Sequence, residues 1–281
     1  MAAAPPLPPE AIIEDDVRRA LAEDFGDGDV TADLIDACAT MRARIVCRER
    51  AVIAGIAWAQ ACFVACDAGV RIEWQCVDGE RVDSDAVLCH IEGRARALVG
   101  AERCALNFLQ TLSATATVTR SYVDAVAGTR ARILDTRKTL PGLRLAQKYA
   151  VRCGGGVNHR IGLFDAILIK ENHVAAAGGI APAIATARAR HPDLLLEVEV
   201  ESLDELATAL RNGADRVLLD DFTPAMLREA VALAAGRVPL EVSGSVDLAR
   251  VRAIAESGVD YISVGALTKH IHAIDLSMRF E

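Results

Sequence analysis

The sequence has few aromatic residues, no excess of positive charge and no paired cysteines. Aromatic side chains make up 4% of the 281 residues, and the formal net charge is −8. No overall positive field is therefore available to attract nucleic acid. Eight cysteines occur, but none forms a C-x-x-C pair or has histidines at zinc-ligand spacing. The composition excludes a general nucleic-acid binder and a zinc module, and it predicts reduced, buried cysteines in a cytoplasmic protein.

Membrane and export signals are also missing from the sequence. The longest apolar runs are interrupted well short of a membrane span, and the opening "MAAAPPLPPE" has no basic stretch followed by an apolar core. We interpret residues 1–9 as a flexible, proline-rich leader. The chain does contain 52% hydrophobic and 25% charged residues, which supports a large core and little disorder. Its length suits a barrel-sized domain with a smaller partner domain.

The first third of the chain mixes helical and strand patterns. Residues 10–24 repeat apolar positions on one helical face. Short alternating segments over residues 41–92 predict strands, with a helical stretch at 56–68 between them. Residues 101–127 contain neither glycine nor proline, and their long pattern predicts a helix that leads out of this region. We therefore expect an N-terminal α/β (α+β) domain over residues 10–112.

After residue 130 the pattern changes to short apolar runs that alternate with helical segments. The six runs are "ARILDT", "FDAILIK", "LLLEVEV", "DRVLLD", "VPLEVS" and "DYISVG". Such runs predict parallel strands that are buried on both faces. We expect an open α/β barrel of six or more parallel strands over residues 113–267, with the tail 268–281 as a candidate to pack on the first domain. A doubly wound open sheet is the alternative, because periodicity alone does not separate the two.

Charged and small residues follow the predicted strands at their carboxyl ends. In parallel α/β proteins these ends open on one face, where ligands bind. Glu199 lies inside a run that is otherwise apolar, and an unpaired buried carboxylate costs several kcal/mol. It therefore needs a charged partner, a metal or a ligand hydroxyl, although a solvated strand end is the simpler interpretation for any one of these residues. The residues at the six exits are Arg137 and Lys138, Lys170, Glu199, Asp220, Ser243–Ser245 and Gly265–Ala266.

The segment 135–173 is a basic island in an acidic protein. It holds Arg137, Lys138, Arg144, Lys148, Arg152, His159, Arg160 and Lys170. The triple glycine 154–156 would let backbone N–H groups approach a ligand closely. Several guanidinium and ammonium groups that converge on one pocket imply a small polyanionic substrate.

These motifs together resemble the quinolinate phosphoribosyltransferase family. The motifs, in order, are "EDFGDGDVT", "GAERCALNFLQTLSATAT", "TRKTLPGLR", "GGGVNHRIGLFDAILIKENH", "LEVEVES", "VLLDDF", "EVSGS" and "ISVGALTKH". The resemblance implies an N-terminal α/β domain, a C-terminal open α/β barrel and a homodimer with shared active sites. It also implies the conversion of quinolinate and phosphoribosyl pyrophosphate to nicotinate mononucleotide, pyrophosphate and carbon dioxide in NAD biosynthesis, with Mg²⁺ as cofactor.

The resemblance also implies roles for individual residues. Arg137, His159 and Arg160 would hold the two carboxylates of quinolinate, with Lys170 close by. Arg103 would reach the site of the neighbouring subunit. Lys138, Lys170, Glu199 and Asp220 are the expected catalytic residues, and the two acids would bind the ribose hydroxyls or Mg²⁺, directly or through the substrate. The full set of expected substrate-binding residues is Arg103, Thr136, Arg137, Lys138, His159, Arg160, Lys170, Glu199, Asp220, Ser243, Gly244, Ser245, Val264, Gly265 and Ala266, of which the last six form the 5′-phosphate loops.

One departure from the family pattern and two alternative functions stay open at this point. The family's phosphate loop commonly contains Ser-Gly-Gly, whereas this chain has Ser243-Gly244-Ser245, so the geometry of that loop is in question. One alternative is a nicotinate-type phosphoribosyltransferase that handles a single carboxylate and releases no carbon dioxide. The other is a barrel that binds phosphorylated metabolites without catalysis.

Overall fold

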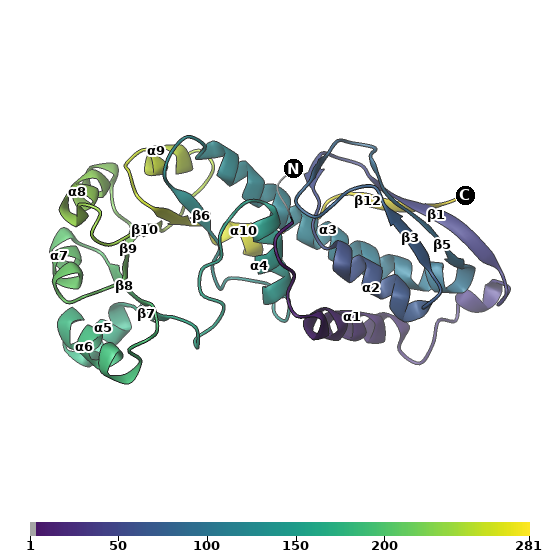
Figure 1. Cartoon of the computed structure of the whole chain (residues 1–281), viewed down its shortest axis with the longest axis horizontal. Helices are drawn as coiled ribbons and strands as arrows, with labels where there is room; N and C mark the ends of the chain where they lie inside the picture. The colour runs from purple at the N-terminus through teal and green to yellow at the C-terminus, as the bar shows by residue number, and fades with distance from the viewer. Residues whose placement is uncertain (1–3) are drawn as a thin grey trace. The chain divides into compact units, whose positions relative to one another are not determined.

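The computed structural model describes residues 4–281 and divides the chain into two compact units (Figure 1). The first unit contains the described residues up to Arg120 together with Thr139–Gly155 and Leu267–Glu281. The second contains Ser121–Lys138 and Gly156–Ala266. Both units are therefore discontinuous in sequence, and the C-terminal tail belongs to the first. Of the expected leader, residues 1–3 lie outside the described part, and residues 4–9 contain neither helix nor strand.

The first unit is an antiparallel sheet with helices along one face (Figure 1). Its four strands pair in the order β12-β1-β5-β3, so the last strand of the chain pairs with the first. The elements are α1 (Glu10–Phe25), a 3-10 turn (Ala32–Leu34), β1 (Thr40–Cys47), β2 (Ala51–Val52), α2 (Ile56–Cys66), β3 (Arg71–Trp74), β4 (Arg81–Val82), β5 (Val87–Arg94), α3 (Ala95–Ala125), α4 (Arg144–Cys153), α10 (Ala266–Lys269) and β12 (Leu276–Phe280). The helices expected at 10–24, 56–68 and 101–127 are confirmed as α1, α2 and α3.

The apolar core of the first unit lies between its sheet and α2 and α3. Trp58, Phe63, Leu109 and Leu112 are at most 1% exposed. The one buried acid on α1, Asp16, accepts a hydrogen bond of 3.0 Å from the Trp58 indole, which satisfies the indole N–H as burial requires. Among residues 4–281 no helix is long and apolar enough to cross a membrane.

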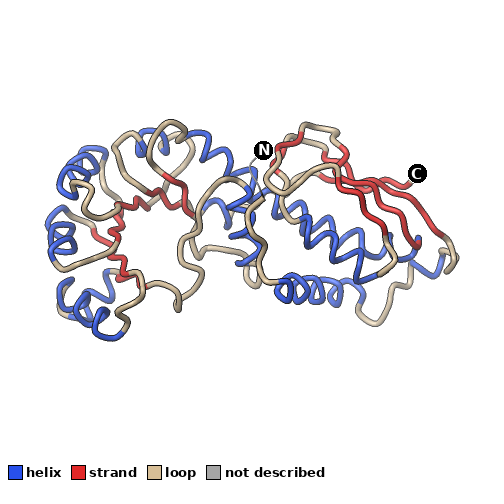
Figure 2. The backbone as a smooth tube through the Cα atoms, viewed as in Figure 1, coloured by secondary structure: helices blue, strands red, loops and turns tan. Residues whose placement is uncertain are grey.

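The second unit is a six-stranded parallel sheet that curves into an open barrel, with its helices on the outer side (Figure 2). The strand order is β6-β11-β10-β9-β8-β7, so the first strand of the barrel pairs with the last, and the chain order is kept from β7 to β11. A doubly wound sheet would instead reverse its order and carry helices on both faces. The elements are β6 (Arg132–Leu134), β7 (Ile167–Ile169), α5 (Glu171–Ala177), α6 (Ile180–Arg190), β8 (Leu196–Val200), α7 (Leu203–Arg211), β9 (Arg216–Asp220), α8 (Pro224–Ala234), β10 (Leu240–Ser243), α9 (Val251–Ala255) and β11 (Tyr261–Ser263). The expected barrel is confirmed.

The triple glycine serves packing more than ligand approach. Gly154 ends α4, and a Cβ atom there would lie 2.5 Å from the Ala116 carbonyl oxygen and 2.5 Å from Thr119 Cβ on α3. The N–H groups of Gly154 and Gly155 donate to the carbonyls of Ala150 and Arg152. The close contact of α4 with α3 thus depends on the missing side chain, and these two N–H groups are already used within the protein.

We predict that Gly154→Ala destabilises the protein by about 1–3 kcal/mol, the usual cost of forcing a methyl group into a packed interior. Gly69→Ala is the matched control, because its nearest neighbour would be Asp67 Oδ1 at 3.4 Å, an ordinary contact. Thermal and urea unfolding of the two variants beside the unaltered protein would measure the difference. Equal midpoints for Gly154→Ala and Gly69→Ala would contradict the packing role.

Candidate active site

The exits of β6 and β11 lie side by side at the carboxyl-terminal edge of the barrel. The parallel pairing joins Ser263 to Leu134, so the residues that follow each strand meet. The side chain of Lys138 lies over Gly265, where an added Cβ atom would be 3.1 Å from Lys138 Cδ and 3.7 Å from Thr136 Oγ1. Thr136 Oγ1 also accepts a hydrogen bond of 3.0 Å from the Lys138 N–H. Glycine at position 265 therefore makes room for the charged side chain of Lys138 beside the loop.

An acid pair occupies the exits of the neighbouring strands β8 and β9. Lys170 Nζ, from the end of β7, lies 2.5 Å from Glu199 Oε2, and the Glu199 side chain is only 11% exposed. Burial raises the pKa of Glu199, and the nearby Asp220 raises it further, whereas Lys170 opposes the shift. Burial and the adjacent Asp221 likewise raise the pKa of Asp220. Lys170 thus neutralises part of a carboxylate cluster that is electrostatically unfavourable without a cation.

Arg137 and Arg160 form the basic part of the same mouth. Burial lowers the pKa of Arg160, and the positive charge of Arg137 lowers it further, so the two guanidinium groups are close enough to repel each other. The Arg160 guanidinium donates to the Ala166 carbonyl at 3.2 Å. Asp165 shapes the loop that follows Arg160 by accepting hydrogen bonds from the N–H groups of Ile161 and Gly162 at 2.7 and 2.8 Å. Two neighbouring guanidinium groups held in this way favour an anionic ligand.

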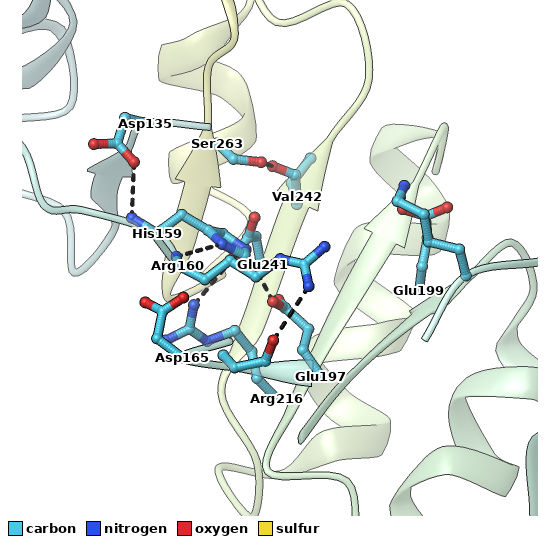
Figure 3. Close-up of polar contacts among 12 residues, drawn as sticks. Asp135, His159, Arg160, Asp165, Glu197, Glu199, Arg216, Glu241, Val242 and Ser263 are labelled. Carbon is cyan, nitrogen blue, oxygen red and sulfur yellow. Dashed lines mark hydrogen bonds and ion pairs between the residues drawn. The ribbon is translucent and has the colours of Figure 1, made fainter. Parts of the chain in front are cut away.

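Asp135 connects the exit of β6 to the basic loop. The residue is fully buried, and its carboxylate accepts from Asn158 Nδ2 at 2.6 Å and from the His159 N–H at 2.9 Å (Figure 3). A carboxylate that receives several hydrogen bonds fixes the groups that donate them. The position of Arg137 and Lys138 on one side and of His159 and Arg160 on the other therefore depends on Asp135.

His159 turns its ring towards two buried glutamates rather than towards the solvent (Figure 3). Its Nε2 lies 2.9 Å from Glu197 Oε2 and 3.5 Å from Glu241 Oε2. Its Nδ1 accepts a hydrogen bond of 2.7 Å from the Arg160 N–H. Burial raises the pKa of both glutamates, and with the added charge of Glu197 the pKa of Glu241 rises to about 8.

Two domain families of known proteins match the chain over most of its length. The model described as "Quinolinate phosphoribosyl transferase, N-terminal domain" matches residues 29–113, and that described as "Quinolinate phosphoribosyl transferase, C-terminal domain" matches residues 115–279. The chain belongs to the quinolinate phosphoribosyltransferase family.

Relatives of similar length support this membership. The chain is 44% identical over 274 residues to a nicotinate-nucleotide pyrophosphorylase (carboxylating) of Mycobacterium leprae, which covers 94% of this chain and 95% of the relative. It is 38% identical to a decarboxylating quinolinate phosphoribosyltransferase of Nicotiana glauca over 99% of this chain and 85% of the relative. The solved nicotinate-nucleotide pyrophosphorylase of Francisella tularensis superposes with a TM-score of 0.94 at 45% identity and covers both chains completely.

The two loops expected to bind the 5′-phosphate differ from the expectation in one detail. Val264 donates its N–H to the Leu134 carbonyl at 2.9 Å, so this amide is used to extend the β6–β11 pairing. The N–H groups of Gly265 and Ala266 follow it at the barrel mouth. On the other loop, Ser243 ends β10, Gly244 has a φ of +95°, and Ser245 has a φ of +41°.

The second unit assembles most of the expected residues, and it adds others that sequence patterns did not single out. Thr136, Arg137, Lys138, Lys170, Glu199, Asp220 and the two expected phosphate loops all lie at strand exits of one barrel, and His159 and Arg160 lie in the loop that precedes β7. Arg103 lies exposed on α3, within the first unit. Asp135, Glu197, Arg216 and Glu241 were missed. For Glu197 and Glu241 a signal existed, because a charged residue in the middle of an apolar parallel strand rarely lacks a buried partner.

We predict that Ser245→Gly raises the stability of the protein by roughly 0.5–1 kcal/mol, because glycine relieves the left-handed conformation and returns part of that gain as chain entropy. Ser243→Gly, two residues earlier at the end of β10, has no left-handed backbone to relieve and should lower stability. Opposite shifts of the thermal midpoint are therefore expected. A midpoint that falls in both variants would show that Ser245 makes contacts that outweigh its backbone strain.

Proposed function

We propose that this protein catalyses the decarboxylating phosphoribosylation of quinolinate, with phosphoribosyl pyrophosphate as the second substrate. The observation that carries the proposal is that one barrel mouth contains two neighbouring cations, Arg137 and Arg160, and two neighbouring acids, Glu199 and Asp220. The first pair suits a dicarboxylate, and the second suits a ribose and a divalent cation. The names of relatives that are 38–44% identical over nearly the full chain support the same reaction.

The basic side of the mouth would bind quinolinate. Arg137 and Arg160 would each receive a carboxylate, and their mutual repulsion would fall when two negative charges arrive. Lys170 would be shared between the substrates, because its ammonium lies 2.5 Å from Glu199 and extends from the exit next to the basic loop. His159 would act mainly through its contacts with the protein below the ligand, since both ring nitrogens already face protein groups.

The acidic side would bind phosphoribosyl pyrophosphate. Glu199 and Asp220 offer hard carboxylate oxygens. Burial raises the pKa of both carboxyl groups, and a cation or ribose hydroxyls would offset this cost of burying their charge. Magnesium held there would neutralise charge on the pyrophosphate. Lys138, over Gly265, would face the leaving group, and the Gly244, Gly265 and Ala266 amides would take the 5′-phosphate.

Position and charge can account for the chemistry without a protein nucleophile. The pyridine nitrogen attacks the ribose C1 atom as the bond to pyrophosphate breaks, through a state with oxocarbenium character that Glu199 and Asp220 would stabilise. The nitrogen then carries a positive charge. The C2 carboxylate leaves as carbon dioxide, and the electron pair that remains on C2 is stabilised by that charge until a proton bonds to it. Alignment of the two substrates would supply most of the acceleration.

The nicotinate-type alternative shares the fold alone. Human nicotinic acid phosphoribosyltransferase superposes with a TM-score of 0.66 at 13% identity. An incubation of the protein with magnesium, phosphoribosyl pyrophosphate and either quinolinate or nicotinate separates the possibilities. We expect carbon dioxide and nicotinate mononucleotide in the incubation with quinolinate and no product in the incubation with nicotinate. Product from nicotinate without carbon dioxide would favour the alternative, and binding without product would favour a non-catalytic barrel.

Arg137→Ala and Arg160→Ala should each lower kcat/KM for quinolinate by an amount equivalent to several kcal/mol of activation free energy, the usual cost of removing one partner of a desolvated ion pair. The affinity for phosphoribosyl pyrophosphate with magnesium should change little. Asp220→Asn is the converse control: it should weaken that second ligand and spare quinolinate. Calorimetric titration of each ligand would show the pattern, and equal losses for both ligands in the arginine variants would refute the assignment.

We further propose that the protein acts in the cytoplasm as a homodimer in which Arg103 completes the partner's site. The eight free cysteines support a reducing compartment, and the exposed side chain of Arg103 on α3 supports a role outside its own unit.

Arg103→Ala and Lys170→Ala homodimers should then each be nearly inactive, because every site lacks one group. Subunit exchange between them should restore part of the activity, since some heterodimers contain one intact site. Exchange can be followed with differently tagged subunits. A mixture that exchanges fully but stays inactive would eliminate the shared site.

A further inference from the structure

Two glutamates project into the interior of the barrel below the candidate active site. Glu197 on β8 is 1% exposed and Glu241 on β10 is fully buried (Figure 3). Glu197 Oε1, Glu197 Oε2 and Glu241 Oε1 have no hydrogen-bond partner among the residues that the structure describes. A buried carboxylate costs several kcal/mol unless opposite charges offset it. The barrel therefore keeps this pair at a cost, which calls for a role beyond packing.

The charges that offset the glutamates come from a barrel strand and from the basic loop. Arg216 Nη1, on β9, lies 3.3 Å from Glu241 Oε2, and its guanidinium also stacks 4.5 Å from the centre of the Tyr261 ring. His159 Nε2 lies 2.9 Å from Glu197 Oε2. The positive charge of Arg160 also interacts favourably with Glu197. The glutamates are thus connected to two consecutive residues of the loop that shapes the basic side of the mouth.

The contacts of His159 make it a rigid link between the barrel interior and that loop. Its backbone N–H donates to Asp135, and its Nδ1 accepts the Arg160 N–H at 2.7 Å. A ring nitrogen that accepts an N–H carries no proton, so a neutral ring has its proton on Nε2, which faces the glutamates. Nδ1 is therefore in a hydrogen bond before any substrate arrives, and Nε2 lies 2.9 Å from Glu197 Oε2 without hydrogen-bond geometry.

We propose that Glu197 and Glu241 are positioning residues for the quinolinate site, which hold the ring of His159 in the barrel interior and thereby fix the backbone from which Arg160 reaches its ligand. This inference rests on the proposed function, because the ligand that Arg160 would receive is quinolinate. The same histidine and two carboxylates also lie within 4.8 Å of one another, a set that a divalent cation accepts. Arg216 and Arg160 already supply two positive charges, and burial and the charge of Glu197 keep Glu241 mostly protonated at neutral pH, so the positioning role is the one that the charges favour.

The decisive variants are Glu197→Gln and Glu241→Gln, which keep the size of the side chain and abolish its ability to ionise. Glu229→Gln, on the exposed face of α8, is the matched control. Quinolinate should bind about ten-fold more weakly to each buried variant, because small displacements of a binding group are costly. Binding of phosphoribosyl pyrophosphate with magnesium should stay within about two-fold. In turnover assays KM for quinolinate should rise more than kcat falls.

The expected direction separates positioning from simple electrostatics. Loss of the negative charge of Glu197 near Arg160 would by itself strengthen the binding of an anion, and Glu241, with a pKa of about 8, has little charge to lose at neutral pH, so weaker binding is explained by lost position. Unchanged or tighter binding of quinolinate to both variants would overturn the inference. Equal weakening of both ligands would also overturn it, since that pattern indicates general disruption. Stoichiometric metal in the unaltered protein that is lost in Glu241→Gln would replace it with a metal site.

Nitrogen-15 spectra of the histidine rings in the unaltered protein test the same inference if the variants do not fold. The His159 signals, assigned by their loss in His159→Asn, should show an unprotonated Nδ1 and a protonated Nε2, and they should keep this pattern when quinolinate is added. A ring that becomes doubly protonated on addition would be a direct carboxylate ligand and would contradict the positioning role. Failure of the unaltered protein to bind quinolinate at all would instead refute the proposed function, and the inference with it.

Discussion

The parallel pairing of β6 with β11 is the interaction on which the candidate active site depends. It joins Arg132 to Tyr261 and Leu134 to Ser263, residues that lie far apart in the sequence. Asp260 strengthens the junction, because its carbonyl accepts the Arg132 N–H and its carboxylate pairs with Arg130. Without this pairing β6, and Lys138 after it, would be separate from the five remaining strands β11-β10-β9-β8-β7. With it, Lys138 lies over Gly265, and the first and last exits of the barrel become neighbours.

The mouth of the barrel holds charges in an arrangement that its ligands would complete. Arg137 and Arg160 repel each other on one side, and Glu199 and Asp220 repel each other on the other. Lys170 reduces the second conflict by pairing with Glu199. Charges fixed in advance by the fold need little reorganisation when a substrate of opposite charge arrives, which is how positioned charges lower a barrier. The repulsion within each pair of like charges is thus part of the preparation of the site for ligands.

The sequence predicted the barrel and its mouth because strand periodicity and the identity of the exit residues are local properties. It placed Glu199 near the site but passed over Glu197, although the two residues share a face of β8. The reason is physical: strands buried on both faces are apolar throughout, so the pattern does not show which face points inward. The partners of Glu197 come from β9, β10 and the loop at His159, and only the folded barrel brings them together. The triple glycine was interpreted as a ligand loop for a similar reason, since its contact with α3 is not visible in the sequence.

The Ser243–Ser245 loop shows how one substitution can follow from a neighbouring constraint. A Cβ atom at Gly244 would lie 2.5 Å from Asp221 Oδ1 and 3.4 Å from Asp220 Oδ1, so glycine is required where the loop passes these two aspartates. Asp221 and Ser245 are both left-handed, with φ of +53° and +41°, and each such residue costs of order 1–3 kcal/mol. Arg250 donates to the Ser245 carbonyl at 3.2 Å and so helps to hold the strained turn. The loop keeps its shape through its close approach to Asp220 and Asp221 and through the hydrogen bond from Arg250. A serine is tolerated at 245 because these contacts, and not the backbone preference of residue 245, hold the left-handed turn.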